Sequence, residues 1–212
     1  MRTDDLVRAL VADNTIRSAP VSQYFAIAVT TGFTIAAILF DVRLGPRPDF
    51  IAVLSEPRFI FKFVVTLTLA ATATVLVLRM ARPGVETRPS ALALAAGPVL
   101  LVFGVLIELA SVPSSSWATK LIGTNVVFCL TQVPLLAAPL LVAALIALRH
   151  GAPTRPAVSG AVAGLMAGGF GAALYATHCT DDSPLFVATW YSIAIAAVAI
   201  VGTLLGQRIL RW

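Results

Sequence analysis

Charged side chains are scarce in this sequence. Only 12% of its 212 residues are charged, whereas 58% are hydrophobic. A soluble domain usually has about 25% charged residues, so the composition excludes an ordinary soluble globular protein. The net charge of +5 comes from basic residues that lie singly, without a dense basic run and without the interleaved aromatic residues of a nucleic-acid groove. Direct binding of DNA or RNA is therefore not expected.

Catalytic motifs are also lacking. The chain has no Ser/His/Asp constellation, no helix-borne metal motif and no phosphate-binding loop. Transporters place ionisable groups near the middle of the bilayer, but here Glu108 is the only acidic residue within an apolar run, and it lies near the end of that run. We therefore expect neither an enzyme nor a resident cofactor, although a soft metal ion could bind transiently.

What the sequence does contain is six apolar runs. They reach or approach the roughly 20 residues that cross a bilayer as a helix. The runs are residues 22–40, 60–79, 91–110, 126–148, 157–177 and 185–206. Proline stands just before five of them, where its missing N–H costs nothing. The sequence predicts an all-α membrane protein: a cytoplasmic segment (1–21) with a short amphipathic helix, then a bundle of six transmembrane helices (22–212).

Basic residues indicate how this bundle is oriented. An even number of spans places both termini on one side, and Lys and Arg are enriched on the cytoplasmic side. One side has ten basic residues: Arg2, Arg8, Arg17, Arg79, Arg82, Arg88, Arg149, Arg155, Arg208 and Arg211. The other side has five: Arg43, Arg47, Arg58, Lys62 and Lys120. Both termini are predicted to be cytoplasmic.

The chain has two cysteines, and both are predicted at the non-cytoplasmic side. Cys129 lies about one turn inside the fourth span, and Cys179 lies in the short loop after the fifth. In an oxidising compartment such a pair can form a disulfide, provided that the Cα atoms come within about 7 Å. Two interpretations stay open: cysteines that pack as small hydrophobic residues, or a functional thiol pair.

A metal site is a further interpretation of the same region. Cys129, His178 and Cys179 offer thiolate and imidazole ligands for zinc or a similarly soft ion. Additional oxygen donors are Glu108, Asp181 and Asp182. Each donor also has a structural explanation, since Asp182 or Ser183 can cap the sixth helix. Adjacent His and Cys residues are also awkward ligands for one tetrahedral ion.

Two apolar patterns predict helix contacts. Gly160, Gly164 and Gly168 recur every four residues, a spacing that lets another helix approach closely. That helix could belong to the same chain or to a second copy in a homodimer. At the amino terminus, a short helix would present one apolar stripe, which consists of Leu6, Val7, Leu10 and Val11. The stripe could lie on the membrane surface or dock in the groove of a protein partner.

The segment from Gly160 to Tyr191, GAVAGLMAGGFGAALYATHCTDDSPLFVATWY, resembles the hallmark region of the NrsF-like membrane anti-sigma factors. The opening MRTDDLVRALVADN and the cysteine in the fourth span are also similar to that family. The resemblance implies a bacterial inner-membrane protein that holds an extracytoplasmic-function sigma factor and releases it under oxidative or heavy-metal stress. It also implies that Cys129 and Cys179 sense the stress.

Two other classes of protein remain as alternatives. A membrane thiol oxidoreductase would be expected to have a C-x-x-C pair of low-pKa thiols, and this chain has none. A metal-handling membrane protein would be recognised by metal analysis of the purified chain.

Overall fold

The computed structural model describes residues 2–13 and 21–211, and the part described contains helices but no strand. Within these described residues, six helices are long and apolar enough to cross a membrane: Val21–Arg43 (α2), Pro57–Met80 (α4), Arg88–Ser111 (α5 and α6), Val126–Leu148 (α8), Pro156–Ala176 (α9) and Pro184–Ile209 (α10, η2 and α11). Their bounds lie close to those predicted, because proline begins α4, α9 and α10 as expected.

Three of the spans contain smaller elements or breaks. The third span consists of α5 (Arg88–Ala93) and α6 (Ala96–Ser111). The sixth consists of α10 (Pro184–Phe186), the π-helix η2 (Val187–Tyr191) and α11 (Ser192–Ile209). Pro134 and Pro139 lie inside α8. Each of these features interrupts the regular hydrogen-bond ladder of a helix.

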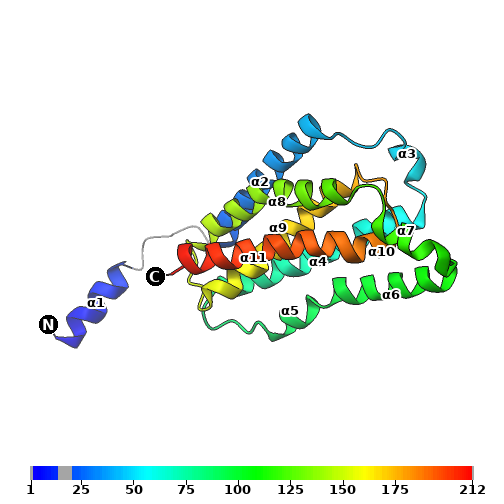
Figure 1. Cartoon of the computed structure of the whole chain (residues 1–212). Helices are drawn as coiled ribbons and strands as arrows, with labels where there is room; N and C mark the ends of the chain where they lie inside the picture. Colours follow the sequence, from blue (N-terminus) through cyan, green and yellow to red (C-terminus); the bar gives the residue numbers. More distant parts are fainter. Residues whose placement is uncertain (1, 14–20, 212) are drawn as a thin grey trace.

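Short helices lie outside the spans. The loop after α2 contains α3 (Phe50–Val53). The turn η1 (Ser114–Ser116) and α7 (Trp117–Ile122) connect α6 to α8. Figure 1 shows α3 and α7 at one end of the bundle, whereas α1 (Thr3–Asp13) and the last turn of α11 lie at the opposite end. We call these the loop end and the terminal end.

Helix α9 forms the centre of the bundle and contacts α2, α4, α8 and α11. Its glycines face close neighbours: a Cβ atom on Gly164 would lie only 2.6 Å from the Cα atom of Ala199, and Gly160 lies against Gly202 and Gly206 of α11. Gly168 packs against Ile195, which also belongs to α11. The predicted glycine ridge thus contacts α11 of the same chain, which leaves it covered rather than free to join a second copy.

Candidate functional site

Both cysteines lie at the loop end, in one buried cluster. Cys179 belongs to the segment between α9 and α10, residues 177–183, which we call the thiol loop, and Cys129 lies in the first turns of α8. Both are free and have 0% exposure. They share an apolar cluster with Tyr175, Phe186 and Tyr191. The structure therefore brings together the two residues that the sequence singled out.

The thiol loop is attached to the beginning of α8 through Asp181. Its carboxylate accepts hydrogen bonds from the backbone N–H groups of Thr124 (3.0 Å) and Asn125 (2.8 Å) and from the Asn125 side-chain amide (2.9 Å). A carboxylate in this position satisfies amides at a helix N-terminus and opposes the positive end of the helix dipole. The left-handed turn at Gly123 (φ 60°) permits this approach, because a Cβ atom there would lie 2.8 Å from the Asp181 carboxylate.

The other side of the thiol loop is held by two buried cations. The Lys62 ammonium donates to the carbonyl oxygen of Cys179 (2.7 Å) and to Asp182 Oδ1 (2.5 Å), and its side chain has 0% exposure. The Arg47 guanidinium donates to Asp182 Oδ2 (2.9 Å) and, with two nitrogens, to Asp49 (2.6 and 2.7 Å). Both cations lie over the ring of Phe59. We call Arg47, Asp49, Lys62 and Asp182 the ion cluster.

The electrostatics of this region keep the Cys179 thiol protonated. Burial raises the pKa of Cys179, and the nearby positive charge of Lys62 opposes that shift only in part. The Arg47 guanidinium holds the pKa of the Asp49 carboxyl below its usual range through their hydrogen bonds, and Asp49 raises the pKa of Arg47 in return. Since the thiolate is the reactive form of cysteine, the resting site is poorly reactive.

The other predicted ligands are distributed around the thiols. His178 Nδ1 lies 2.9 Å from the carbonyl oxygen of Gly45, and Glu108 pairs with Arg58 (2.9 Å) and Lys120 (3.2 Å). Ser183, rather than Asp182, caps α10 by accepting from the Leu185 N–H. Among residues 2–13 and 21–211, no three His, Cys, Asp or Glu side chains gather where one metal ion could bind them.

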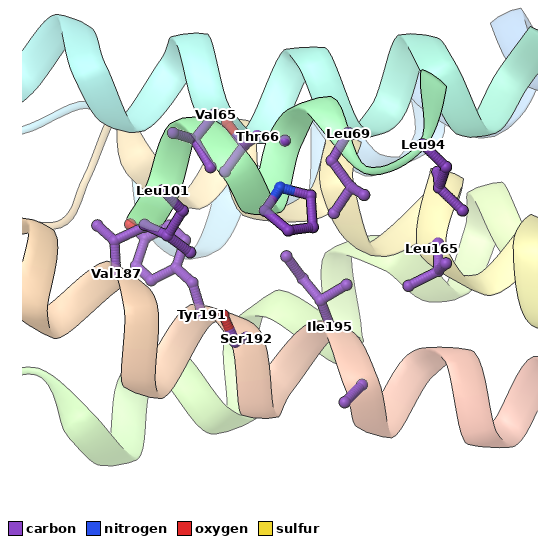
Figure 2. A pocket seen from close by; sticks show the side chains of 13 residues that line it. Val65, Thr66, Leu69, Leu94, Leu101, Leu165, Val187, Tyr191, Ser192 and Ile195 are labelled. Carbon is purple, nitrogen blue, oxygen red and sulfur yellow. The ribbon is translucent and has the colours of Figure 1, made fainter. Parts of the chain in front are cut away.

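Two tyrosines complete the surroundings of the thiols. Tyr175 and Tyr191 are buried and their ring centroids lie 5.8 Å apart. The Tyr175 hydroxyl donates to the Asn125 carbonyl oxygen at 3.5 Å. Tyr191 also borders an apolar cavity of about 250 Å³ between α4, α6, α9 and the sixth span. Figure 2 shows its ring beside Val187 and Leu101 at one end of that cavity.

The predicted partner-binding stripe lies at the terminal end, far along the chain from the thiols. Leu6, Val7 and Val11 of α1 are exposed. Leu10 belongs to α1, but its side chain is not among those that the structure describes. Figure 1 shows α1 standing apart from the bundle, so this apolar stripe lacks cover from the described part of the chain.

Sequence reasoning missed the ion cluster. It assigned Arg47 and Lys62 only to the basic residues that flank the spans, whereas the structure buries both side chains. The available indication was Lys62 itself, a cation two residues inside the apolar run 60–79. An ionisable residue within a span usually has a partner and a role. The partner, Asp182, lies 120 residues away in sequence, and no local pattern identifies it.

Comparison with known proteins identifies the family of this chain. The family described as negative regulator of sigma F, NrsF, matches residues 10–212. The chain belongs to the NrsF family. The probable anti-sigma-F factor NrsF of Azospira oryzae is 34% identical over 219 positions, which cover 100% of both chains. The anti-sigma-F factor NrsF of Caulobacter vibrioides is 33% identical with the same coverage. No solved structure matches this NrsF chain.

The ion cluster leads to a prediction about stability. Asp182→Asn removes the carboxylate that Lys62 and Arg47 share, and leaves two buried cations short of negative charge. Breaking such a pair costs about 3–5 kcal/mol, so we expect a clearly lowered unfolding temperature of the detergent-solubilised protein. Asp49→Asn is the matched control, because Asp49 is half exposed and should change stability little. Equal unfolding temperatures for the two variants would contradict the assigned role of Asp182.

Proposed function

We propose that this protein is a membrane anti-sigma factor that sequesters an extracytoplasmic-function sigma factor and is not an enzyme. The observation that supports this most strongly is the end-to-end match to the NrsF family, in which both relatives named above are anti-sigma-F factors. Six apolar helices with few residues outside them fit a protein whose task is to retain a partner at a membrane. The partner would be the sigma factor itself, without direct contact to nucleic acid.

The proposed orientation is N-in and C-in, in the inner membrane of a bacterium. The ten basic residues at the predicted cytoplasmic side support it. So does the arrangement in Figure 1, where α1 and the last turn of α11 share the terminal end. The sigma factor would then bind at the terminal end, and the thiol loop would face the periplasm, where disulfides can form.

The proposed signal is a change at Cys129 and Cys179, by disulfide formation under oxidative stress or by capture of a heavy metal ion. Three features support a sensing role: these are the only cysteines, they are buried in one cluster, and both lie at a junction of α4, α8 and α9. A disulfide requires Cα atoms about 4.4–6.8 Å apart. Any adjustment toward that geometry strains the attachment of the thiol loop to α8 through Asp181 and to Arg47 and Lys62 through Asp182, and the helices attached to them repack.

The sensing role predicts that the cysteines are needed for release and not for binding. In native cells, the wild-type protein should co-purify with a sigma factor, and a brief oxidant pulse should deplete that partner. Cys129→Ser and Cys179→Ser remove either thiol with a side chain of similar size, so both variants should retain the sigma factor before and after the pulse. The bound proteins are identified by mass spectrometry, with total sigma factor measured as the control.

Two results of that experiment would contradict the proposal. Release of the sigma factor from both serine variants would exclude thiol sensing, while leaving the anti-sigma activity intact. The absence of any sigma factor from every sample would overturn the anti-sigma assignment itself. Metal analysis of the same purified samples would show whether a soft metal ion occupies the thiols.

The stripe on α1 is the proposed contact with the sigma factor, because an exposed amphipathic helix can dock in the groove of a partner. Leu6→Ser, Val7→Ser and Val11→Ser together should abolish co-purification, as should deletion of residues 2–14. The matched control is Asp5→Ser with Arg8→Ser, which alters the opposite face of the same helix and keeps the net charge. If the stripe variant still binds the sigma factor, the stripe has another role, such as lying on the membrane surface.

A further inference from the structure

The terminal end contains a hollow that the proposed function does not use. Its volume is about 410 Å³, and it is lined by Val21, residues 81–83 and residues 150–152. Val21 begins α2, and the other two segments belong to the turns that follow α4 and α8. Because α3 and α7 mark the loop end, these three helix ends lie at the opposite end of the bundle (Figure 1). The hollow is therefore at the end where the sigma factor is proposed to bind.

Two contacts fix the shape of the hollow. The backbone N–H of Ala152 donates to the carbonyl oxygen of Ala81 (3.1 Å), which joins the turn after α8 to the turn after α4. Gly151 permits this approach, because a Cβ atom there would lie 2.7 Å from the same oxygen. The ring of His150 stacks on that of Tyr24 in α2, with centroids 4.8 Å apart and an interplanar angle of 14°. Three helix ends are thus held around one hollow.

The lining indicates the kind of segment that fits. It is apolar at Val21, Ala81 and Pro83, and it contains the exposed guanidinium of Arg82 and the imidazole of His150. None of the described residues that line it is acidic. An apolar side chain flanked by carboxylates complements such a surface in both polarity and charge.

The hollow is also within reach of a partner that occupies the α1 stripe. Helix α1 ends at Asp13 and α2 begins at Val21, so even a fully extended chain limits the distance between these two residues to about 29 Å. That is close to the diameter of a small domain, about 30 Å. One sigma factor can therefore contact the stripe and the hollow together, and two linked contacts bind more tightly than either alone.

We propose that this hollow is a second contact for the sigma factor, which inserts an apolar side chain flanked by acidic residues beside Arg82. The inference rests on the anti-sigma function proposed above. It adds the place of a second contact and the chemistry of the partner segment that the contact selects.

The hollow is placed to respond to the thiol loop. At the loop end, Lys62 of α4 holds the carbonyl oxygen of Cys179, and the Asp181 carboxylate holds the first amides of α8. At the terminal end, the turns that follow these same two helices meet at Ala81 and Ala152. A displacement of α8 relative to α4 therefore moves the two turns apart and deforms the hollow. In the proposed switch, this deformation releases the inserted segment.

The first test changes the charge of the hollow. The reduced, full-length protein in lipid nanodiscs is titrated with the sigma factor identified by co-purification, at 0.15 M salt, where exposed charges more than about 8 Å apart are largely screened. Arg82→Glu should weaken binding at least about tenfold, because a carboxylate then faces the acidic segment. Arg208→Glu is the matched control, since Arg208 lies in the last turn of α11 and outside the hollow. It should leave the affinity nearly unchanged.

The second test changes the shape of the hollow without changing its charge. Gly151→Ala places a Cβ atom against the Ala81 carbonyl oxygen, so the two turns must move apart. Gly84→Ala is the matched control: Gly84 also lies in the turn after α4 and its φ of 78° strains an alanine, but a Cβ atom there meets open space. Without any oxidant, Gly151→Ala should weaken binding roughly tenfold, the loss of one central contact. Gly84→Ala should bind like the unsubstituted protein.

Three results would overturn the proposal. Equal affinities for Arg82→Glu and Arg208→Glu would exclude the acidic segment, and equal affinities for Gly151→Ala and Gly84→Ala would exclude a role for the shape of the hollow. A loss in Arg82→Glu that occurs in nanodiscs with anionic phospholipid, and disappears with purely zwitterionic phospholipid, would assign the hollow to lipid headgroups instead. Unfolding temperatures of all four variants control for loss of folding.

The unsubstituted protein separates this inference from the function on which it rests. If it binds no sigma factor, the anti-sigma function fails and the inference fails with it. If it binds the sigma factor and all four variants bind equally well, the role of the hollow is excluded while the anti-sigma function stands.

Discussion

The Lys62 ammonium is the group on which the arrangement of the loop end depends. A cation that is wholly withdrawn from solvent near the end of a membrane span is tolerated only when partners surround it. Lys62 finds them in Asp182 and in the carbonyl oxygen of Cys179. Because both partners belong to the thiol loop, satisfying this one charge also fixes the backbone at Cys179. Arg47 reinforces the constraint through the second oxygen of Asp182.

That constraint places the thiol loop between two kinds of attachment. On one side are the charged contacts to Arg47 and Lys62, and on the other is the Asp181 carboxylate at the beginning of α8. A disulfide between Cys129 and Cys179 would strain both sets of contacts. In the proposed switch, this strain displaces α8 and α9. Helix α8 can bend because Pro134 and Pro139 leave gaps in its hydrogen-bond ladder. Helix α9 transmits the displacement because it contacts most of the other spans. Each is a continuous helix between the loop end and the terminal end.

The sequence predicted the helices well because a long apolar run has one stable solution in lipid, a helix that satisfies its own backbone. Proline marked the helix starts, and the glycine spacing in α9 indicated a close helix contact, for equally local reasons; the structure identified α11 as the helix in contact. The pairing of Lys62 with Asp182, the capping of α8 by Asp181 and the position of Tyr191 were not predictable in this way. The first two join residues far apart in sequence, and the third depends on a π-turn that periodicity does not mark.

The most direct test of the coupled switch is the affinity of the sigma factor for two forms of the protein in lipid nanodiscs: fully reduced, and with the Cys129–Cys179 disulfide verified by mass spectrometry. A change in occupancy from 99:1 to 1:99 requires about 5.5 kcal/mol, an affinity ratio of roughly 10⁴. Coupling between the thiols and the terminal end predicts a much weaker complex with the disulfide form, approaching that ratio. Equal affinities for the reduced and disulfide forms would contradict it.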